Sequence, residues 1–150
     1  MALFKISSSG TISEVYRRMF KPTSEITDDA HAVHGQTKSK LADRPTFLAA
    51  DAIEIANIVR GSAGLVVHNK THEARVLHSQ FSMVGQETLL DRSWFPKFIC
   101  TQEMARSEVD HQYQTSLKFL SLKYFNAQQP KKHTALWDAE MCAKLFLKLR

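Results

Sequence analysis

Two short apolar-rich segments open the chain. The segments ALFKIS and TISEVYRRMF contain many β-branched and aromatic residues, and a Ser/Gly break separates them. Runs of this kind around such a break are typical of two strands joined by a turn. The sequence therefore predicts a β-hairpin over residues 2–20.

The middle of the chain alternates between helix-like and strand-like patterns. Residues 45–61 predict a helix with Pro45 near its start and Gly61 as its stop. GLVVHN follows as a strand that is apolar on both faces, as a buried parallel strand is, and residues 71–81 predict another helix. The apolar positions of the first helix are Phe47, Ala50, Ile53 and Ala56, and Ala74, Leu77 and Phe81 are expected to share one face of the second.

The last third of the chain predicts one strand and three helices. KFICT is a short strand pattern, and the helix QEMARSEV follows it. Ser116 is placed to cap a second helix. Residues 135–149 form the third helix. The expected stripes are Leu117, Leu120 and Tyr124, and then Ala139, Cys142, Phe146 and Leu149. A hairpin followed by a strand–helix–strand unit predicts an α/β fold with a mixed sheet flanked by helices.

The composition indicates one globular domain over residues 1–150, because 43% of the residues are hydrophobic and 23% are charged. No apolar run approaches the roughly 18 residues of a membrane span, and the N-terminus lacks the pattern of a signal peptide. We therefore expect a cytoplasmic protein that is not embedded in a membrane. Cys100 and Cys142 share no metal or redox spacing and are expected to be buried free thiols.

The net charge of +5 favours a polyanionic partner only weakly. The basic residues of the C-terminal segment 117–150 are Lys118, Lys123, Lys131, Lys132, Lys144, Lys148 and Arg150, against only Asp138 and Glu140. This segment is suited to contact phosphates, although a solvated helix face has the same composition.

The corner VVHNKTHEARVL is a candidate site because a β-branched run ends at His68-Asn69 and a helix pattern begins with Glu73 in its first turn. A zinc site is a competing interpretation, since His68 and His72 are four residues apart. The end of the strand places His68 off the helix, however, and HEARVLH lacks the His-Glu-x-x-His spacing. The pattern does not favour zinc.

Four stretches of the chain, in order, resemble the DnaQ-like 3′-to-5′ exonucleases, a family that includes the proofreading epsilon subunit of bacterial DNA polymerase III. The stretches are ITDDAHAVHGQTKSKLADRPTF, LVVHNKTHEARVL, FICTQEMAR with the later SLKFLSLKYF, and HTALWDAEMCAKLFLKL. The resemblance covers nearly the whole chain. It implies a ribonuclease H-like fold, which has a five-stranded mixed sheet flanked by helices.

The resemblance also implies a catalytic set. His133 falls on the general-base position, Asp138 on the last carboxylate, and Glu73 on the middle carboxylate, where the family usually has Asp. Two-metal cleavage of a phosphodiester uses carboxylates that hold two divalent ions about 3.5–4 Å apart. The implied cofactor is Mg²⁺ or Mn²⁺, with Asp138 and Glu73 as metal ligands and His133 activating water.

The expected partner is nucleic acid, either single-stranded or at its 3′ end. The residues expected to bind it are His34, Gly35, His68, Asn69, Lys131 and Lys132. By resemblance, His34-Gly35 belongs to the loop that packs against the terminal nucleotide; taken alone, this dipeptide is a simple turn.

The family's first strand, which carries an Asp-x-Glu pair, corresponds to positions before Met1. We therefore expect a truncated or degenerate relative whose sheet lacks its central strand and exposes two unpaired edges. An upstream segment, a protein partner or a homodimer is expected to complete the sheet. Three functions remain open: an exonuclease active once the strand is supplied, a catalytically inactive nucleic-acid-binding protein, and a protein-interaction subunit.

Overall fold

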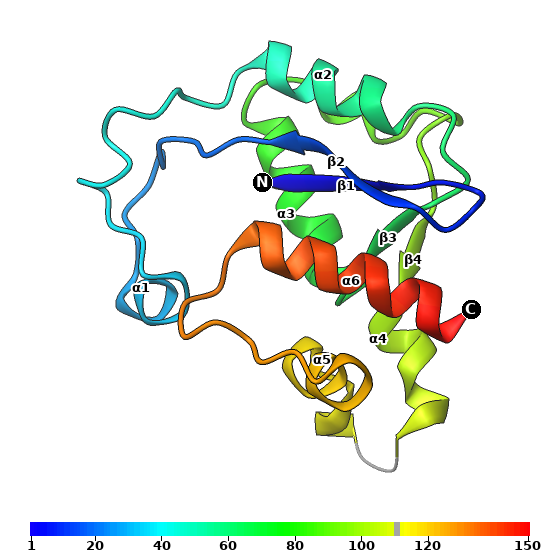
Figure 1. Ribbon diagram of the computed structural model, residues 1–150. Helices are drawn as coiled ribbons and strands as arrows, with labels where there is room; N and C mark the ends of the chain where they lie inside the picture. Colours follow the sequence, from blue (N-terminus) through cyan, green and yellow to red (C-terminus); the bar gives the residue numbers. More distant parts are fainter. Residues whose placement is uncertain (110–111) are drawn as a thin grey trace.

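The computed structural model describes residues 1–109 and 112–150 (Figure 1). The strands are β1 (Ala2–Ile6), β2 (Ile12–Arg17), β3 (Leu65–Val67) and β4 (Phe98–Cys100). The α-helices are α1 (Asp28–His34), α2 (Ala49–Val59), α3 (Lys70–Ser82), α4 (Thr101–Met104), α5 (Leu117–Phe125) and α6 (Ala135–Leu149). Short 3₁₀ helices are η1 (Glu87–Leu89), η2 (Ala105–Glu108) and η3 (Gln112–Thr115). No helix in this described part is long and apolar enough to cross a bilayer.

Strands β1 and β2 form the predicted hairpin. They pair antiparallel, with Ala2 opposite Arg17 and Ile6 opposite Ile12, and a register shift lies between Leu3 and Phe4. The amide of Gly10 closes the turn onto the Ser7 carbonyl oxygen at 3.0 Å.

Strands β3 and β4 form a parallel pair, with Leu65 opposite Phe98 and Val67 opposite Cys100. Helix α3 lies in the connection between them, as the sequence predicted for a strand–helix–strand unit. Gly64 permits the close approach of β4, since a Cβ at this position would lie 2.3 Å from Ile99 Cδ1. The mixed α/β architecture is therefore confirmed.

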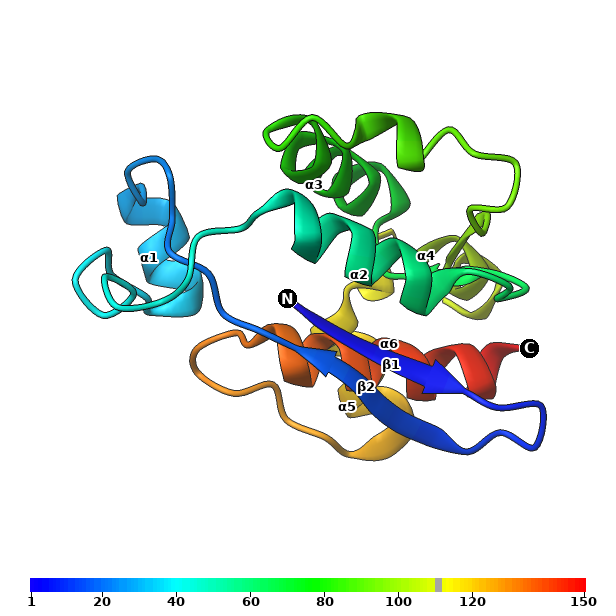
Figure 2. The ribbon, with the colours of Figure 1, turned by 90° about the horizontal axis from the view of Figure 1, so that it is seen from above.

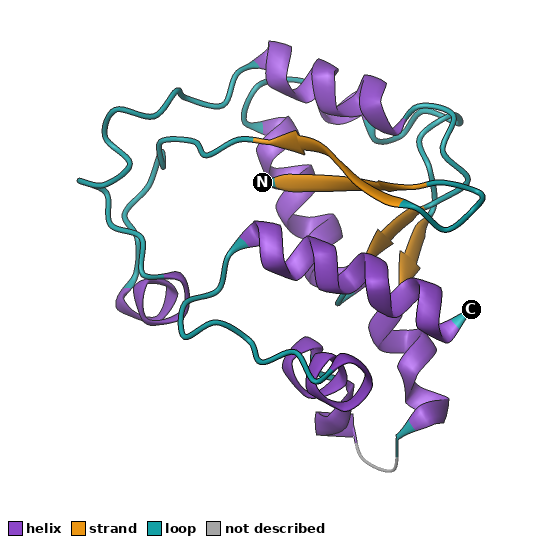
Figure 3. Cartoon of the chain, in the orientation of Figure 1, coloured by secondary structure: helices purple, strands orange, loops and turns teal. Residues whose placement is uncertain are grey.

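The strands of the described residues form two separate two-stranded sheets, not one continuous sheet (Figure 3). β1 is hydrogen-bonded to β2, and β3 to β4, but no ladder joins β1 to β3. The two facing edges agree with the expectation of a sheet without its central strand. All three residues of β3 remain only partly buried, although each is apolar.

Helices cover the hairpin from two sides (Figures 1 and 2). Helix α6 packs against β1, β2 and β3 and so spans both sheets. On the other side, α2 and α3 meet the hairpin in one core, whose buried members are Tyr16, Phe47, Ala52, Ile55, Ala56 and Phe81. A second core joins the η2 turn, α5 and α6 through the fully buried Ala105, Leu120 and Leu145.

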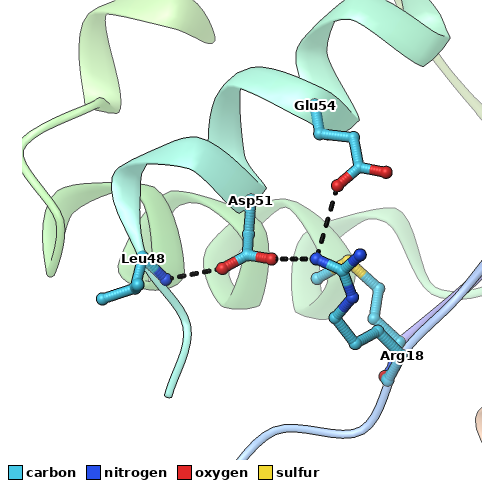
Figure 4. Close-up of polar contacts among 5 residues, drawn as sticks. Arg18, Leu48, Asp51 and Glu54 are labelled. Atoms are coloured by element: carbon cyan, nitrogen blue, oxygen red, sulfur yellow. Dashed lines mark hydrogen bonds and ion pairs between the residues drawn. The ribbon is translucent and has the colours of Figure 1, made fainter. Parts of the chain in front are cut away.

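Asp51 ties the end of the hairpin to α2 (Figure 4). Its carboxylate accepts a hydrogen bond from the Leu48 amide at 2.8 Å, which caps the helix, and forms an ion pair with Arg18. Glu54 lies on the outer side of the same guanidinium, at 3.3 Å. Asp51 is only 7% exposed, so the pair lies at the edge of the core.

The structure differs from the sequence analysis in the details of three helices. The face of α2 that packs inward carries Ala52, Ile55, Ala56 and Val59, whereas the predicted Ile53 is 44% exposed and Ala50 is also exposed. The shift arises because α2 begins at Ala49, so that Phe47 is buried from the preceding loop.

Helix α6 buries more than its predicted stripe. Cys142 is buried as expected, but Met141, Ala143 and Leu145 are buried as well. The cause is that α6 contacts strands on one side and α4 and α5 on another. Helix α1 was not predicted at all; Thr27 caps it, Asp28 and Asp29 occupy its first turn, and Gly35 ends it in the left-handed conformation at φ 67°.

Candidate active site

Asn69 forms the corner between β3 and α3. It adopts the left-handed conformation, at φ 65° and ψ 71°, and its side-chain oxygen accepts a hydrogen bond from the His72 amide at 3.3 Å. Asn is one of the few residue types that tolerate this backbone region and also cap helices. The cap sets the first turn of α3, from which Glu73 projects.

The start of α6 positions the second carboxylate. Thr134 caps the helix by accepting a hydrogen bond from the Trp137 amide at 3.2 Å, and Asp138 lies in the first turn. His133 immediately precedes the cap, and its amide donates to the Val33 carbonyl oxygen at 3.1 Å. Hydrogen bonds therefore hold the backbone at His133 and at the residue that follows it.

The His133 ring lies beside Asp138, with 3.8 Å between Nδ1 and Oδ2. That distance permits an electrostatic attraction but is too long for a hydrogen bond. Gln129 Nε2 lies closer to the same Nδ1, at 3.2 Å. Asp138 Oδ1 is buried and has no hydrogen-bond partner within the described part of the chain.

Burial raises the pKa of both carboxylates. Burial raises the pKa of Asp138 above its ordinary value, while the His133 charge and a hydrogen bond with Gln129 oppose the increase. Burial also raises the pKa of Glu73, a protonated His72 lowers it, and the Asp138 charge raises it further. The structure thus brings Glu73, His133 and Asp138 together, from two helices that meet only in the folded chain.

His68 lies behind this cluster. Its Nδ1 is 2.9 Å from Thr101 Oγ1, and the Thr101 hydroxyl is 3.2 Å from the Val67 carbonyl oxygen. Burial lowers the pKa of His68 to about 4, and a hydrogen bond with the Thr115 backbone opposes this only in part. His68 is therefore uncharged at neutral pH and offers a phosphate no positive charge.

The cysteines are buried free thiols, as predicted. Cys100 Sγ accepts a hydrogen bond from the Lys70 amide at 3.4 Å, and Cys142 Sγ lies 3.6 Å from Thr101 Oγ1. Burial raises the pKa of Cys142 to about 12, so this thiol stays protonated and unreactive.

The loop before α6 is docked on the end of α1. Lys132 Nζ donates to the Ala32 carbonyl oxygen at 2.9 Å, and the Lys132 stem lies over Gly35. The His34 ring accepts a hydrogen bond from the Gln36 amide at 3.0 Å. This contact joins three of the residues predicted to bind nucleic acid, although they are far apart in the sequence.

The remaining predicted residues occupy different places. Lys131 is exposed beside Lys132, while His68 and Asn69 belong to the β3–α3 corner. The nucleic-acid contacts and catalytic roles assigned from the sequence stay predictions. Sequence reasoning missed Gln129 and Thr101: no motif marks Gln129, whereas Thr101 directly follows the predicted strand KFIC at the edge where β3 also ends.

The donor set of the cluster is two carboxylates. Hard oxygen donors suit Mg²⁺ or Mn²⁺, and the partnerless Oδ1 of Asp138 is a free acceptor. Within residues 1–109 and 112–150, however, no group of three or more His, Cys, Asp or Glu side chains is placed to hold a metal ion. The chemistry of these donors fits a divalent cation.

A family model described as Exonuclease (RNase_T) matches residues 1–146. The chain belongs to the DnaQ-like 3′-to-5′ exonuclease family. This exonuclease-family chain is 29% identical over 152 residues to the DNA polymerase III subunit epsilon of Buchnera aphidicola subsp. Schizaphis graminum (strain Sg). The match covers 95% of the chain but only 64% of that relative, so the chain spans a little under two thirds of the relative's length.

A solved structure of exonuclease X in complex with 5′-overhanging duplex DNA is similar over 99% of the exonuclease-family chain and 79% of its own, with a TM-score of 0.66. Their sequences are 22% identical, a level at which the likeness shows the fold alone. The ribonuclease H-like fold predicted from the sequence is thereby confirmed.

Proposed function

We propose that this domain acts on or binds the 3′ ends of nucleic acids through the cluster of Glu73, His133 and Asp138. The observation that carries the proposal is that cluster itself: a histidine 3.8 Å from the Asp138 carboxylate, which is close enough to Glu73 to raise the pKa of Glu73. Membership of the exonuclease family supports the reaction class, which is hydrolysis of a phosphodiester.

His133 would serve as the proton acceptor for the attacking water. Histidine is the side chain used most often for proton transfer near neutral pH. Asp138 would stabilise the protonated form of the ring by charge, since Oδ2 already lies 3.8 Å from Nδ1. Glu73 projects from the capped start of α3 and would share a cation with Asp138.

Exonucleases of this family generally use divalent metal ions. Mg²⁺ or Mn²⁺ would be held by Asp138 and Glu73, whose pKa values are raised mainly by burial. When bound, such an ion supplies positive charge to the reacting phosphate and acidifies water. Two carboxylates do not complete a two-ion site, so we propose that the chain alone hydrolyses nucleic acid weakly or not at all.

The separate sheets support the same proposal. Between β1 and β3, two strand edges lack ladder partners among the described strands. An added strand, supplied by a further segment, a protein partner or a second copy, would pair with these edges. If it carried carboxylates, it would complete the site.

Nucleic-acid contacts would come from the surface around the cluster. Lys131 and Lys132 are exposed next to His133, and His34, Gly35 and Asn69 belong to the segments that flank it. Phosphate-driven binding of this kind weakens steeply with salt. The proposed partners are nucleic acid and a protein subunit. Nucleic acid is proposed because exonuclease X was solved with DNA bound, and a protein subunit because the epsilon relative is named as a subunit of a polymerase.

A second candidate function is binding without hydrolysis, either of nucleic acid or of another protein. The specific observation in its favour is the shortage of metal ligands in the described part of the chain. The two candidates differ in whether a labelled strand is shortened.

The experiment uses 5′-labelled single-stranded DNA and RNA with Mg²⁺ or Mn²⁺. We expect salt-sensitive binding of strands with a free 3′ end and little or no shortening. Any ladder should vanish in Asp138→Ala and His133→Ala and persist in Glu140→Ala, a matched carboxylate on α6 that pairs only with Lys144, at 2.7 Å. Absence of binding at low salt, from a folded chain, would exclude a nucleic-acid function and leave protein interaction.

A further inference from the structure

Gln129 is the group that holds the His133 side chain. The ring belongs to a residue whose side chain is 41% exposed, so packing alone leaves it free to turn. Asp138 Oδ2, at 3.8 Å, is beyond hydrogen-bond distance from Nδ1, whereas Gln129 Nε2, at 3.2 Å, is within it. The shorter distance identifies the amide, and not the carboxylate, as the direct partner of the imidazole.

The direction of this hydrogen bond follows from the atoms that form it. An amide NH₂ group only donates hydrogen bonds, and Gln129 Nε2 is the atom that lies 3.2 Å from the ring. His133 Nδ1 therefore receives an N–H, and in the neutral imidazole the proton then resides on Nε2.

The loop favours this placement. Gln129 is partly buried, whereas its neighbour Gln128 is exposed, although both are the same residue type. Pro130 follows directly and restricts the Gln129 backbone to extended conformations. Lys132 then anchors the far end of the loop on α1.

We propose, as a deepening of the function proposed above and resting on it, that Gln129 is a positioning residue: its amide donates a hydrogen bond to His133 Nδ1 and fixes the orientation and tautomer of the ring. In the free protein, the ring presents Nε2–H as a donor, which suits contact with a phosphate oxygen. For Nε2 to accept a proton, the amide must rotate so that its oxygen receives Nδ1–H. The orientation of the Gln129 amide thus determines whether His133 Nε2 donates a hydrogen bond or accepts a proton.

The test is ¹⁵N and ¹³C NMR of the His133 ring in the metal-free 150-residue chain, at a fixed pH well above the reference pKa of about 6.5. The variants are Gln129→Ala, Gln129→Glu and, as the matched control, Gln128→Ala. We expect the wild-type ring to be ordered and protonated on Nε2. Gln129→Glu should move the proton to Nδ1, because a carboxylate must accept from the ring, and Gln129→Ala should mobilise the ring. Gln128→Ala should change neither signal.

A ring that stays equally ordered in Gln129→Ala, or that keeps its proton on Nε2 in Gln129→Glu, would overturn the proposal. Far-UV circular dichroism and the amide signal of His133, which reports its bond to Val33, identify variants that have lost the fold. The NMR readout requires no activity and no oligonucleotide. Failure of the chain to bind oligonucleotides would refute the proposed function while leaving the ring measurements interpretable.

Discussion

The Lys132 side chain lies directly over the backbone of Gly35. A Cβ built at Gly35 would come within 3.0 Å of Lys132 Cδ and 3.1 Å of Cγ, while the ammonium group is held by the Ala32 carbonyl oxygen. Residues almost one hundred positions apart thus form one contact, which fixes the loop leading to His133 against the end of α1. The absence of a side chain at Gly35 is a packing requirement as well as a backbone one.

Replacing this glycine should therefore destabilise the fold for two reasons. Gly35→Ala places a Cβ in the left-handed region, at φ 67°, which costs about 1–2 kcal/mol, and it also forces Lys132 to move. Gly61→Ala is the matched control, because Gly61 has φ 77° and nothing within 4 Å of its Cβ position. Chemical denaturation should show a larger loss for Gly35→Ala. When Lys132→Ala is also present, Gly35→Ala should destabilise the protein no more than Gly61→Ala does. If the difference between the two glycine variants persists, the contact with Lys132 contributes nothing to it.

Asp51 should matter more than Glu54, although both pair with Arg18. Asp51→Ala removes the ion pair and the acceptor of the Leu48 amide from a position that is only 7% exposed. We expect a loss of about 2 kcal/mol in the free energy of unfolding. Glu54→Ala, whose side chain is 47% exposed, should stay within about 0.5 kcal/mol of wild type. Equal effects in urea unfolding would contradict this ranking.

The strands and most helices were predictable because their signals are local. The run LVV between Gly64 and His68 identifies β3 without knowledge of its partner, and Ser116 caps α5 as its residue type indicates. The buried face of α2 was not predictable from spacing alone. Ile53 and Ile55 are equally apolar, and only the start of the helix at Ala49 and its contact with α3 decide which of them is buried.

The candidate site was predictable only as far as the family resemblance reached. His133, Asp138 and Glu73 stand at motif positions, so the sequence could name them. Gln129 belongs to no motif, and its role depends on a loop conformation that no periodicity records. The effect of the Asp138 charge on the pKa of Glu73 likewise arises only when α3 and α6 are packed.

Neutralising Glu73 should stabilise the protein at neutral pH. Its pKa is raised in the folded state, so the ionised form is less favourable there than in the unfolded chain. The penalty is absent below the unfolded pKa, where both states are protonated, and is complete once the pH exceeds the folded pKa. Glu73→Gln should therefore raise the melting temperature at pH 7 and have little effect at pH 3. Solvent screening keeps the gain below about 1 kcal/mol.

Glu140→Gln on α6 is the control for this experiment. Glu140 Oε1 lies 2.7 Å from Lys144 Nζ, and this surface ion pair stabilises the helix. Its removal should therefore lower the free energy of unfolding slightly at pH 7. An equal gain for both variants would indicate a general effect of the Glu-to-Gln change and not the burial of Glu73. A loss for Glu73→Gln would show that Glu73 is stabilised as a carboxylate, contrary to its raised pKa.

His68 should make the fold sensitive to acid. Its pKa is lowered from an ordinary 6.5 to about 4 in the folded state, so between these values the unfolded chain binds a proton that the folded chain excludes. Stability is therefore complete above the unfolded pKa and declines as the pH falls from 6.5 toward 4, by up to about 3 kcal/mol. His68→Gln, which cannot be protonated, should flatten this decline in unfolding measured at pH 7, 6, 5 and 4. The ring signal should also remain that of neutral imidazole at pH 5. A His68 that titrates near 6.5 would mean that the β3–α3 corner opens to solvent, and the buried contact with Thr101 would then not persist in solution.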